Sequence, residues 1–166
     1  LAEGRIVDTA NEGISHSEGQ GYAMLMAEWA DDRESFERLL NWTRANLSRP
    51  TDHLFSWRWN PAHRPAVRDK NNASDGDLMI AWALLRGAER WNVPAWRALA
   101  ERIGRDILRL CVKQVAGRTV LLPGVSGFDK ADRVTLNPSY YHLAAIRALA
   151  RVVPDSSWAR LDADGR

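Results

Sequence analysis

The spacing of apolar residues constrains the fold of this chain more than any other feature. Apolar side chains recur every three or four residues along most of the 166 residues, which predicts amphipathic helices and an all-α fold. Four helices are expected at residues 17–29, 33–47, 75–91 and 95–115. A fifth opens with Asn137 as its cap, and a sixth begins at Ser156. In the first helix the apolar stripe consists of Tyr22, Leu25, Met26 and Trp29.

The connections between these helices alternate in length. Joints within a pair are only a few residues long, which predicts antiparallel hairpins. The segments 48–73 and 116–136 exceed the usual ~2–8 residues of a helix–helix joint, and loops of that length are typically functional. Short strands are expected in them at residues 55–59 and 119–122. If successive hairpins stack in the same sense, all long loops and the starts of alternate helices gather on one face, which predicts a cleft there.

Composition excludes several classes of function. The 23 basic residues nearly balance 21 acidic ones without forming a basic tract, so we expect no nucleic-acid partner. No apolar run approaches the ~20 residues of a membrane span. The single cysteine, Cys111, is expected in the core, and no His, Cys or acidic spacing matches a metal site. We therefore expect no metal and no cofactor. Eight tryptophans suit a protein that stacks on flat ligands such as sugar rings.

Two carboxyl groups at predicted helix starts, Glu18 and Asp75, are the candidates for catalysis. Cleavage of a glycosidic bond uses two such groups, one as proton donor and one to activate water or attack carbon. Capping provides a non-catalytic alternative, because Ser15 with Glu18 and Ser74 with Asp77 both have the spacing of a capping box. Asp75 could equally be a simple N-cap. Glycines beside both acids favour function, since each costs a helix about 1 kcal/mol and suggests a close approach to the backbone.

Five segments of the chain resemble glycoside hydrolase family 8, in the order of that family. They are residues 17–24 (SEGQGYAM), 52–59 (DHLFSWRW), 72–81 (NASDGDLMIA), 121–128 (LLPGVSGF) and 137–141 (NPSYY). The resemblance covers nearly the whole chain. Within the family, the chain is most similar to bacterial cellulases, including periplasmic ones linked to cellulose synthesis. It implies a periplasmic or secreted location.

The resemblance also implies a fold and a reaction. The expected fold is an (α/α)6 barrel, a toroid of helical hairpins. Residues 1–166 would form the N-terminal half of this single catalytic domain, with the remainder beyond Arg166. The expected reaction is endo-acting, inverting hydrolysis of β-1,4-glucan, with carboxyl groups about 6.5–9.5 Å apart. The base of the family lies on a Ser-Tyr-Asp segment that this chain does not contain. Residues 1–166 alone should therefore be inactive.

Individual residues take their roles from the same resemblance. Glu18 matches the proton donor, and Asp75 matches the second catalytic acid, which would hold the sugar at the cleavage point. Trp57 would be a stacking platform and Tyr140 a lesser sugar contact, with core packing as the alternative for both. Gln20 and Asp77 complete the expected substrate-binding set. The chain departs from the family where Val125 and Ser126 replace an aromatic residue, and where Gly87 replaces alanine.

Three other functions remain open at this point. The same family fold could act on xylan, chitosan or mixed-linkage glucan. The cleft could bind glycan without hydrolysing it. The hairpins could also form a structural array for protein contacts, in which case no cleft is expected. The expected partners are a β-glucan polysaccharide and the C-terminal remainder of the enzyme.

Overall fold

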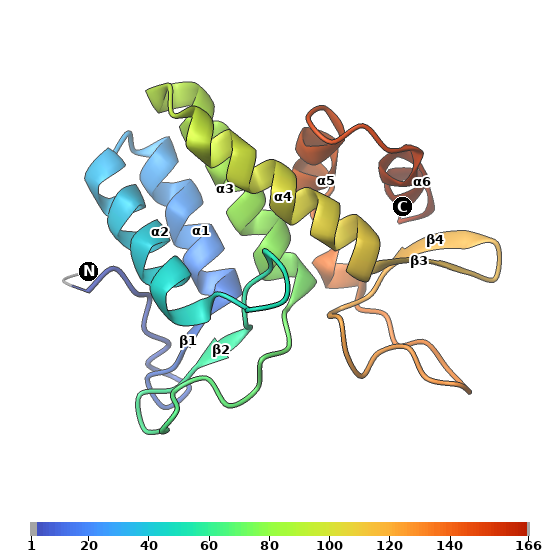
Figure 1. The fold of residues 1–166 in the computed structure, drawn as a ribbon, viewed down its shortest axis with the longest axis horizontal. Coiled ribbons are helices and arrows are strands. Elements are labelled where there is room, and N and C mark those ends of the chain that lie inside the picture. The colour runs from blue at the N-terminus through green and yellow to red at the C-terminus, as the bar shows by residue number, and fades with distance from the viewer. Residues whose placement is uncertain (1–2, 166) are drawn as a thin grey trace.

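A computed structural model describes residues 3–165, and within them the chain forms three helical hairpins (Figure 1). The helices are α1 (Ser17–Trp29), α2 (Arg33–Leu47), α3 (Ser74–Trp91), α4 (Pro94–Leu110), α5 (Leu143–Ala150) and α6 (Ser156–Asp164). The other elements are a 3₁₀ turn, η1 (Pro138–Tyr140), and the strands β1 (Ser15–His16), β2 (Arg58–Trp59), β3 (Val112–Val115) and β4 (Arg118–Leu121). The predicted helical hairpins are confirmed. None of the helices in the described part of the chain is long and apolar enough to cross a bilayer.

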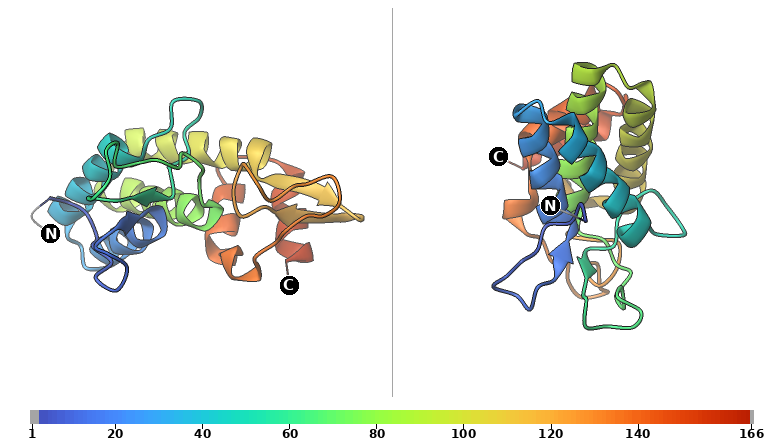
Figure 2. Two further views of the ribbon diagram at one scale, coloured as in Figure 1. Left: turned by 90° about the horizontal axis from the view of Figure 1, so that it is seen from below. Right: turned by 90° about the vertical axis from the view of Figure 1, so that its left-hand side faces the viewer.

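The hairpins lie side by side along the long axis of the molecule (Figure 2), and α3 packs against both α1 and α5. One apolar core runs between the helices. Its largest buried side chains include Met24, Phe36, Leu39, Leu84, Ile103, Ile107 and Trp158. The first two hairpin turns follow from local chemistry: Asp32 caps α2 through Ser35 N, and Asn92 ends α3 in the left-handed conformation that asparagine tolerates. The long loops gather at one end of the helices, as predicted (Figure 1).

Two glycines allow α1 and α3 to approach each other closely. A Cβ on Gly21 would lie 2.7 Å from Met79 Cβ, and a Cβ on Gly76 would lie 2.8 Å from the backbone nitrogen of Glu18. Real Cβ contacts are not that short. The close approach that the glycines suggested is therefore confirmed, and the approaching group is the neighbouring helix.

Two predicted helix boundaries are wrong. The fourth helix ends at Leu110, and the residues after Cys111 form the hairpin β3–β4 instead of continuing to Val115. Its turn, Ala116 and Gly117, has positive φ at both positions, the geometry that closes two-residue hairpins. Asn137 caps only the single turn η1, and α5 starts at Leu143. The strand expected at residues 55–59 is reduced to β2, which pairs with β1.

Three of the four residues in the apolar stripe of α1 face solvent, whereas Leu25 is partly buried against the core. Tyr22, Met26 and Trp29 are 40%, 67% and 80% exposed, whereas an amphipathic helix normally turns such a stripe to the core. The residues that α1 buries instead are Ser17, Gln20, Gly21, Met24, Ala27 and Glu28. These three exposed apolar side chains on one helix are a candidate contact surface.

Candidate active site

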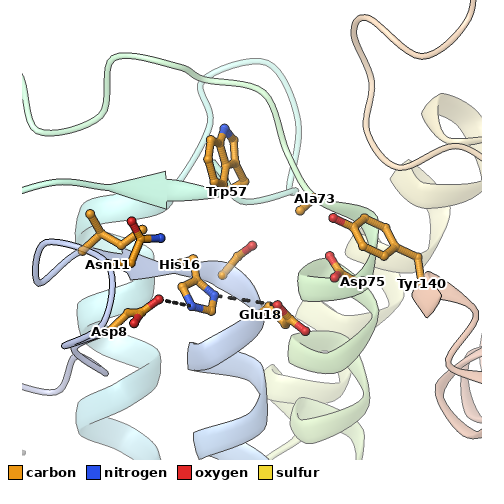
Figure 3. Close-up of a pocket in the computed structure, with 10 residues that line it drawn as sticks. Asp8, Asn11, His16, Glu18, Trp57, Ala73, Asp75 and Tyr140 are labelled. Atoms are coloured by element: carbon orange, nitrogen blue, oxygen red, sulfur yellow. Dashed lines mark ion pairs between the residues drawn. The ribbon is translucent and has the colours of Figure 1, made fainter. Parts of the chain in front are cut away.

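An open pocket lies where α1 and α3 begin, between the loops that precede these helices and the turn η1 (Figure 3). Its lining consists of Asp8, Asn11, Ile14, His16, Ser17, Glu18, Trp57, Ala73, Asp75 and Tyr140. Four of the six residues expected from the sequence therefore come together: Glu18, Asp75, Trp57 and Tyr140. The predicted cleft at the helix starts is confirmed.

Glu18 is the second residue of α1 and does not cap it. The cap is His16, whose Nδ1 accepts the Gly19 N–H at 3.1 Å. Ser15, the proposed partner in a capping box, instead donates its hydroxyl to the Ile6 carbonyl at 2.5 Å and accepts from Arg5. The capping explanation for Glu18 is therefore wrong. Its side chain is 42% exposed and projects into the pocket (Figure 3).

His16 is a pocket residue that the sequence argument missed. Its Nε2 lies 3.8 Å from Asp8 Oδ2 and its Nδ1 lies 3.9 Å from Glu18 Oε2. Because Nδ1 accepts the Gly19 N–H, the ring proton of the neutral imidazole sits on Nε2, facing Asp8. Histidine is not among the preferred capping residues, so no local pattern signalled this role. Asp8 and Asn11 were missed too, because a loop without periodicity brings them to the pocket.

Asp75 lies in the first turn of α3 and is almost fully buried. The residue at the cap is Ala73, which provides no side-chain bond, so Asp75 is not the N-cap. Asp75 Oδ1 accepts the Gly76 N–H at 2.7 Å, and its side chain has little contact with solvent. Burial raises the pKa of Asp75 from 3.8 to about 6; the Gly76 N–H opposes this shift, while the charge of Glu18 adds to it.

The second proposed capping box is also absent. Ser74 donates its hydroxyl to the Leu122 carbonyl at 2.7 Å. Asp77 accepts the Phe55 N–H and the Asn72 side-chain amide, both at 2.8 Å. Neither Asp75 nor Asp77 therefore caps α3. Burial raises the pKa of Asp77 to about 7, although its two hydrogen bonds act in the opposite direction.

Gln20 and Asp77 do not face the pocket, which corrects their expected assignment to substrate binding. Both side chains are fully buried. Gln20 Oε1 accepts the Ile6 N–H at 2.6 Å, while its Nε2 donates to the Gly4 carbonyl and to Thr43 Oγ1. The polar atoms of Asp77 are likewise bonded within the protein. Neither side chain offers a free atom to a sugar, so both belong to the framework beneath the site.

Trp57 and Tyr140 line the same pocket as the two acids, and Tyr140 lies beside Asp75 (Figure 3). The Trp57 indole N–H donates to Asp69 Oδ2 at 2.8 Å, which fixes the ring, and the backbone carbonyl of Trp57 accepts from Ser17 N at the start of α1. Tyr140 comes from η1, and burial, together with the nearby Asp75 and Glu18, raises its pKa. Both rings line the pocket, so core packing alone does not account for them.

The described residues contain no cluster of three His, Cys, Asp or Glu side chains arranged to hold a metal ion. His53, in the first long loop, is used elsewhere, since its Nδ1 lies 2.8 Å from Asp106 Oδ2. Cys111 is fully buried, as expected, and burial raises its pKa to about 12.

Comparison with known proteins assigns the fold. The family model described as "Glycosyl hydrolases family 8" matches residues 1–165. The chain belongs to this family. Family 8 structures are (α/α)6 barrels, and the three hairpins described above correspond to about half of such a barrel.

The family 8 relatives are about twice as long as this chain. An endoglucanase of Cellulomonas uda is 43% identical over the whole chain, which covers 46% of that relative. A probable endoglucanase of Novacetimonas hansenii is 46% identical over 98% of the chain and 47% of its own length. The crystal structure of the endoglucanase Cel10 from Klebsiella pneumoniae matches 99% of the chain, with a TM-score of 0.96 and 45% identity, across 53% of that structure.

Proposed function

We propose that the protein containing this chain hydrolyses β-1,4-glucan at internal bonds, with Glu18 as the proton donor. The observation that carries this proposal is the pair Glu18 and Asp75. They begin adjacent helices, neither caps its helix, and both line one open pocket bordered by two aromatic rings. Two carboxyl groups beside a sugar-stacking surface match the requirement of glycosidic cleavage. The names of the endoglucanase relatives support cellulose as the substrate.

In the proposed mechanism each residue has one task. A glucan chain lies against Trp57, with Tyr140 contacting the sugar beside Asp75. Glu18, whose side chain faces the pocket, donates a proton to the glycosidic oxygen. Asp75, fixed by the Gly76 N–H, accepts hydrogen bonds from hydroxyls of the sugar at the cleavage point. A further carboxylate activates water on the opposite face of the ring, which inverts the anomeric carbon.

We further propose that residues 1–166 form the N-terminal half of a single catalytic domain. The base then lies in the C-terminal remainder, because this chain contains no Ser-Tyr-Asp segment. Two observations support the proposal: the relatives are about twice as long, and α1 exposes the apolar row of Tyr22, Met26 and Trp29. Packing of the remainder onto this row would bury it and close the ring of hairpins. A periplasmic or secreted location would give such an enzyme access to its polymer.

The test is sugar release from carboxymethylcellulose by the full-length protein. Glu18→Gln should reduce the rate by ~10²–10⁴-fold, the usual contribution of general acid catalysis. Glu34→Gln is the matched control: Glu34 also lies in the first turn of a helix, but its side chain is 82% exposed and outside the pocket. A loss below tenfold for Glu18→Gln would reject Glu18 as the acid.

Three further measurements separate the alternatives. NMR of the first product identifies the mechanism, since an inverting enzyme releases the α-anomer from a β-glucan. A module that only binds glycan would retain cello-oligosaccharides without releasing sugar, and a purely structural array would do neither. Parallel assays on xylan, chitosan and mixed-linkage glucan would rank the substrates.

A further inference from the structure

The buried carboxylate of Asp77 connects two loops that flank the start of α3. Asp77 Oδ1 accepts the backbone N–H of Phe55 at 2.8 Å, and Oδ2 accepts Asn72 Nδ2 at 2.8 Å. The other atom of that amide, Asn72 Oδ1, accepts the backbone N–H of Val125 at 2.7 Å. A continuous path of hydrogen bonds therefore runs from the loop 48–73, beneath the pocket, to the loop after β4.

Each bond in this path has a fixed direction. The Val125 N–H can only donate, so the oxygen of Asn72 faces Val125 and its nitrogen faces Asp77. Asp77 must then accept on both oxygens, because a donor faces each of them. An amide of the same shape at position 77 would present a donor to one of its two donor partners. The hydrogen bond between positions 77 and 72 could form again if the Asn72 amide turned over. The Val125 N–H would then lose its acceptor.

Two members of the path lie close in sequence to pocket residues. Phe55 is two residues before Trp57, and Asn72 immediately precedes the cap of α3. The neighbouring Asn71 strengthens the same connection. Its backbone carbonyl accepts the backbone N–H of Trp57, and its side chain exchanges two hydrogen bonds with the backbone of Ser126.

We propose that Asp77 and Asn72 are positioning residues that hold the Trp57 loop and the Val125 loop in register with Asp75. This inference rests on the proposed function for its effect on sugar binding, but not for its effect on the loops. The direction of the hydrogen bonds makes it testable. Asp77→Asn reverses the donor pattern, and adding Asn72→Asp restores it. In this double variant the new amide at position 77 can donate to the new carboxylate at position 72, whose other oxygen accepts the Val125 N–H.

The loops are tested first, by amide hydrogen exchange in the full-length protein without sugar. Asp77→Asn should increase exchange at Val125 at least tenfold, and the double variant should restore protection. Glu28→Gln is the matched control, because Glu28 is also a buried carboxylate with two donors but lies at the far end of α1. Its exchange at Val125 should stay at the wild-type level. If the double variant protects Val125 no better than Asp77→Asn does, the directional path is rejected.

A second variant covers the case in which Asp77→Asn fails to fold. Asn72→Ala removes the acceptor of Val125 and leaves the bond between Asp77 and Phe55 in place. Exchange should then rise at Val125 and remain slow at Phe55. Unchanged protection at Val125 in this variant would also overturn the proposal.

Sugar binding is measured by calorimetry with cellopentaose, in a Glu18→Gln background that prevents turnover. Asp77→Asn should raise the Kd about tenfold, which corresponds to about 1.4 kcal/mol, and the double variant should recover it. In the active enzyme the change should appear in KM and leave kcat within about threefold. Loss of the exchange effect would reject the positioning role. A wild-type protein that shows the exchange pattern but binds no cellopentaose would reject the proposed function alone.

Discussion

The contact of Gly76 with the start of α1 allows a sharp test of how the two acids are held. A Cβ at position 76 would lie 2.8 Å from both Glu18 N and Ser17 Cβ, and would also meet Ser17 Oγ. The Ser17 hydroxyl can rotate away, but the backbone cannot. A carbon is comfortable at about 3.5–4.0 Å from its neighbours, so Gly76→Ala must push the start of α1 back by roughly 0.7 Å.

The expected effect on stability is small and the effect on activity is large. Overpacking of this kind costs about 1–3 kcal/mol, while replacing glycine by alanine inside a helix returns about 1 kcal/mol. The net loss of about 0–2 kcal/mol corresponds to a Tm lower by no more than about 8 °C. A displacement of about 1 Å between reacting groups can cost ~10²-fold in rate. We therefore expect Gly76→Ala to lose roughly 10–100-fold in kcat.

The assay is sugar release from carboxymethylcellulose alongside thermal unfolding. Gly87→Ala is the matched control, since it makes the same substitution in α3, where the new Cβ would meet only the rings of Phe36 and Trp91 at 3.0 and 3.1 Å. It should keep its activity. Adding Ser17→Ala to Gly76→Ala should not rescue the rate, because the backbone contact remains. A folded Gly76→Ala enzyme with more than a third of wild-type activity would refute the reasoning.

Three other substitutions probe separate contacts. Asp75→Asn should abolish activity yet raise the free energy of unfolding at neutral pH by up to about 3 kcal/mol. The reason is that the pKa of Asp75 is raised from 3.8 to about 6 in the folded protein. Its carboxylate therefore destabilises the fold increasingly as pH rises through that interval. Urea unfolding would contradict this if the gain at pH 8 were no larger than at pH 4. Glu28→Gln should lower the free energy of unfolding by about 1.5–3 kcal/mol at pH 7, and by less in acid. Burial raises the pKa of Glu28, but its two arginine partners lower the pKa by more, so the net shift is downward. The stabilisation by the Glu28 carboxylate is therefore lost as pH falls through its folded-state pKa. Asp69→Ala should free the Trp57 ring and raise KM about three- to tenfold with kcat unchanged. Asp69→Asn keeps an acceptor for the indole N–H and should behave like wild type. Equal KM values for the two variants would show that Asp69 does not position the Trp57 ring.

The helices and the location of the site could be predicted because they depend on local patterns. Periodicity located the bounds of α1 and α2, and the alternation of short and long joints placed the helix starts on one face. The end of α4 could not be read in this way. Val112 and Val115 continue the helical spacing of apolar residues, and only the turn at Gly117 and pairing with β4 make this segment a strand.

The exposed stripe of α1 shows where local patterns stop being sufficient. Amphipathicity identifies an apolar face but not its partner. In α1, the neighbours α2 and α3 take up the face with Gln20, Gly21 and Met24, since small and hydrogen-bonded side chains allow the close approach. The row with Met26 and Trp29 is left outside because no element of residues 3–165 covers it.

The misassignment of Gln20 and Asp77 has a geometric cause that the sequence contained. Each stands two residues after a pocket acid, Glu18 or Asp75, in a segment that resembles one family motif. Residues two apart on an α-helix point about 200° apart around its axis, so they cannot face the same pocket. The acid of each pair therefore faces the pocket, and the residue two positions later anchors a loop behind it, Gln20 through Ile6 and Asp77 through Phe55. The two positions should fail differently: Asp75→Asn loses activity and gains stability, whereas Asp77→Asn, which breaks a satisfied network, should loosen the two loops and raise KM while leaving kcat nearly unchanged.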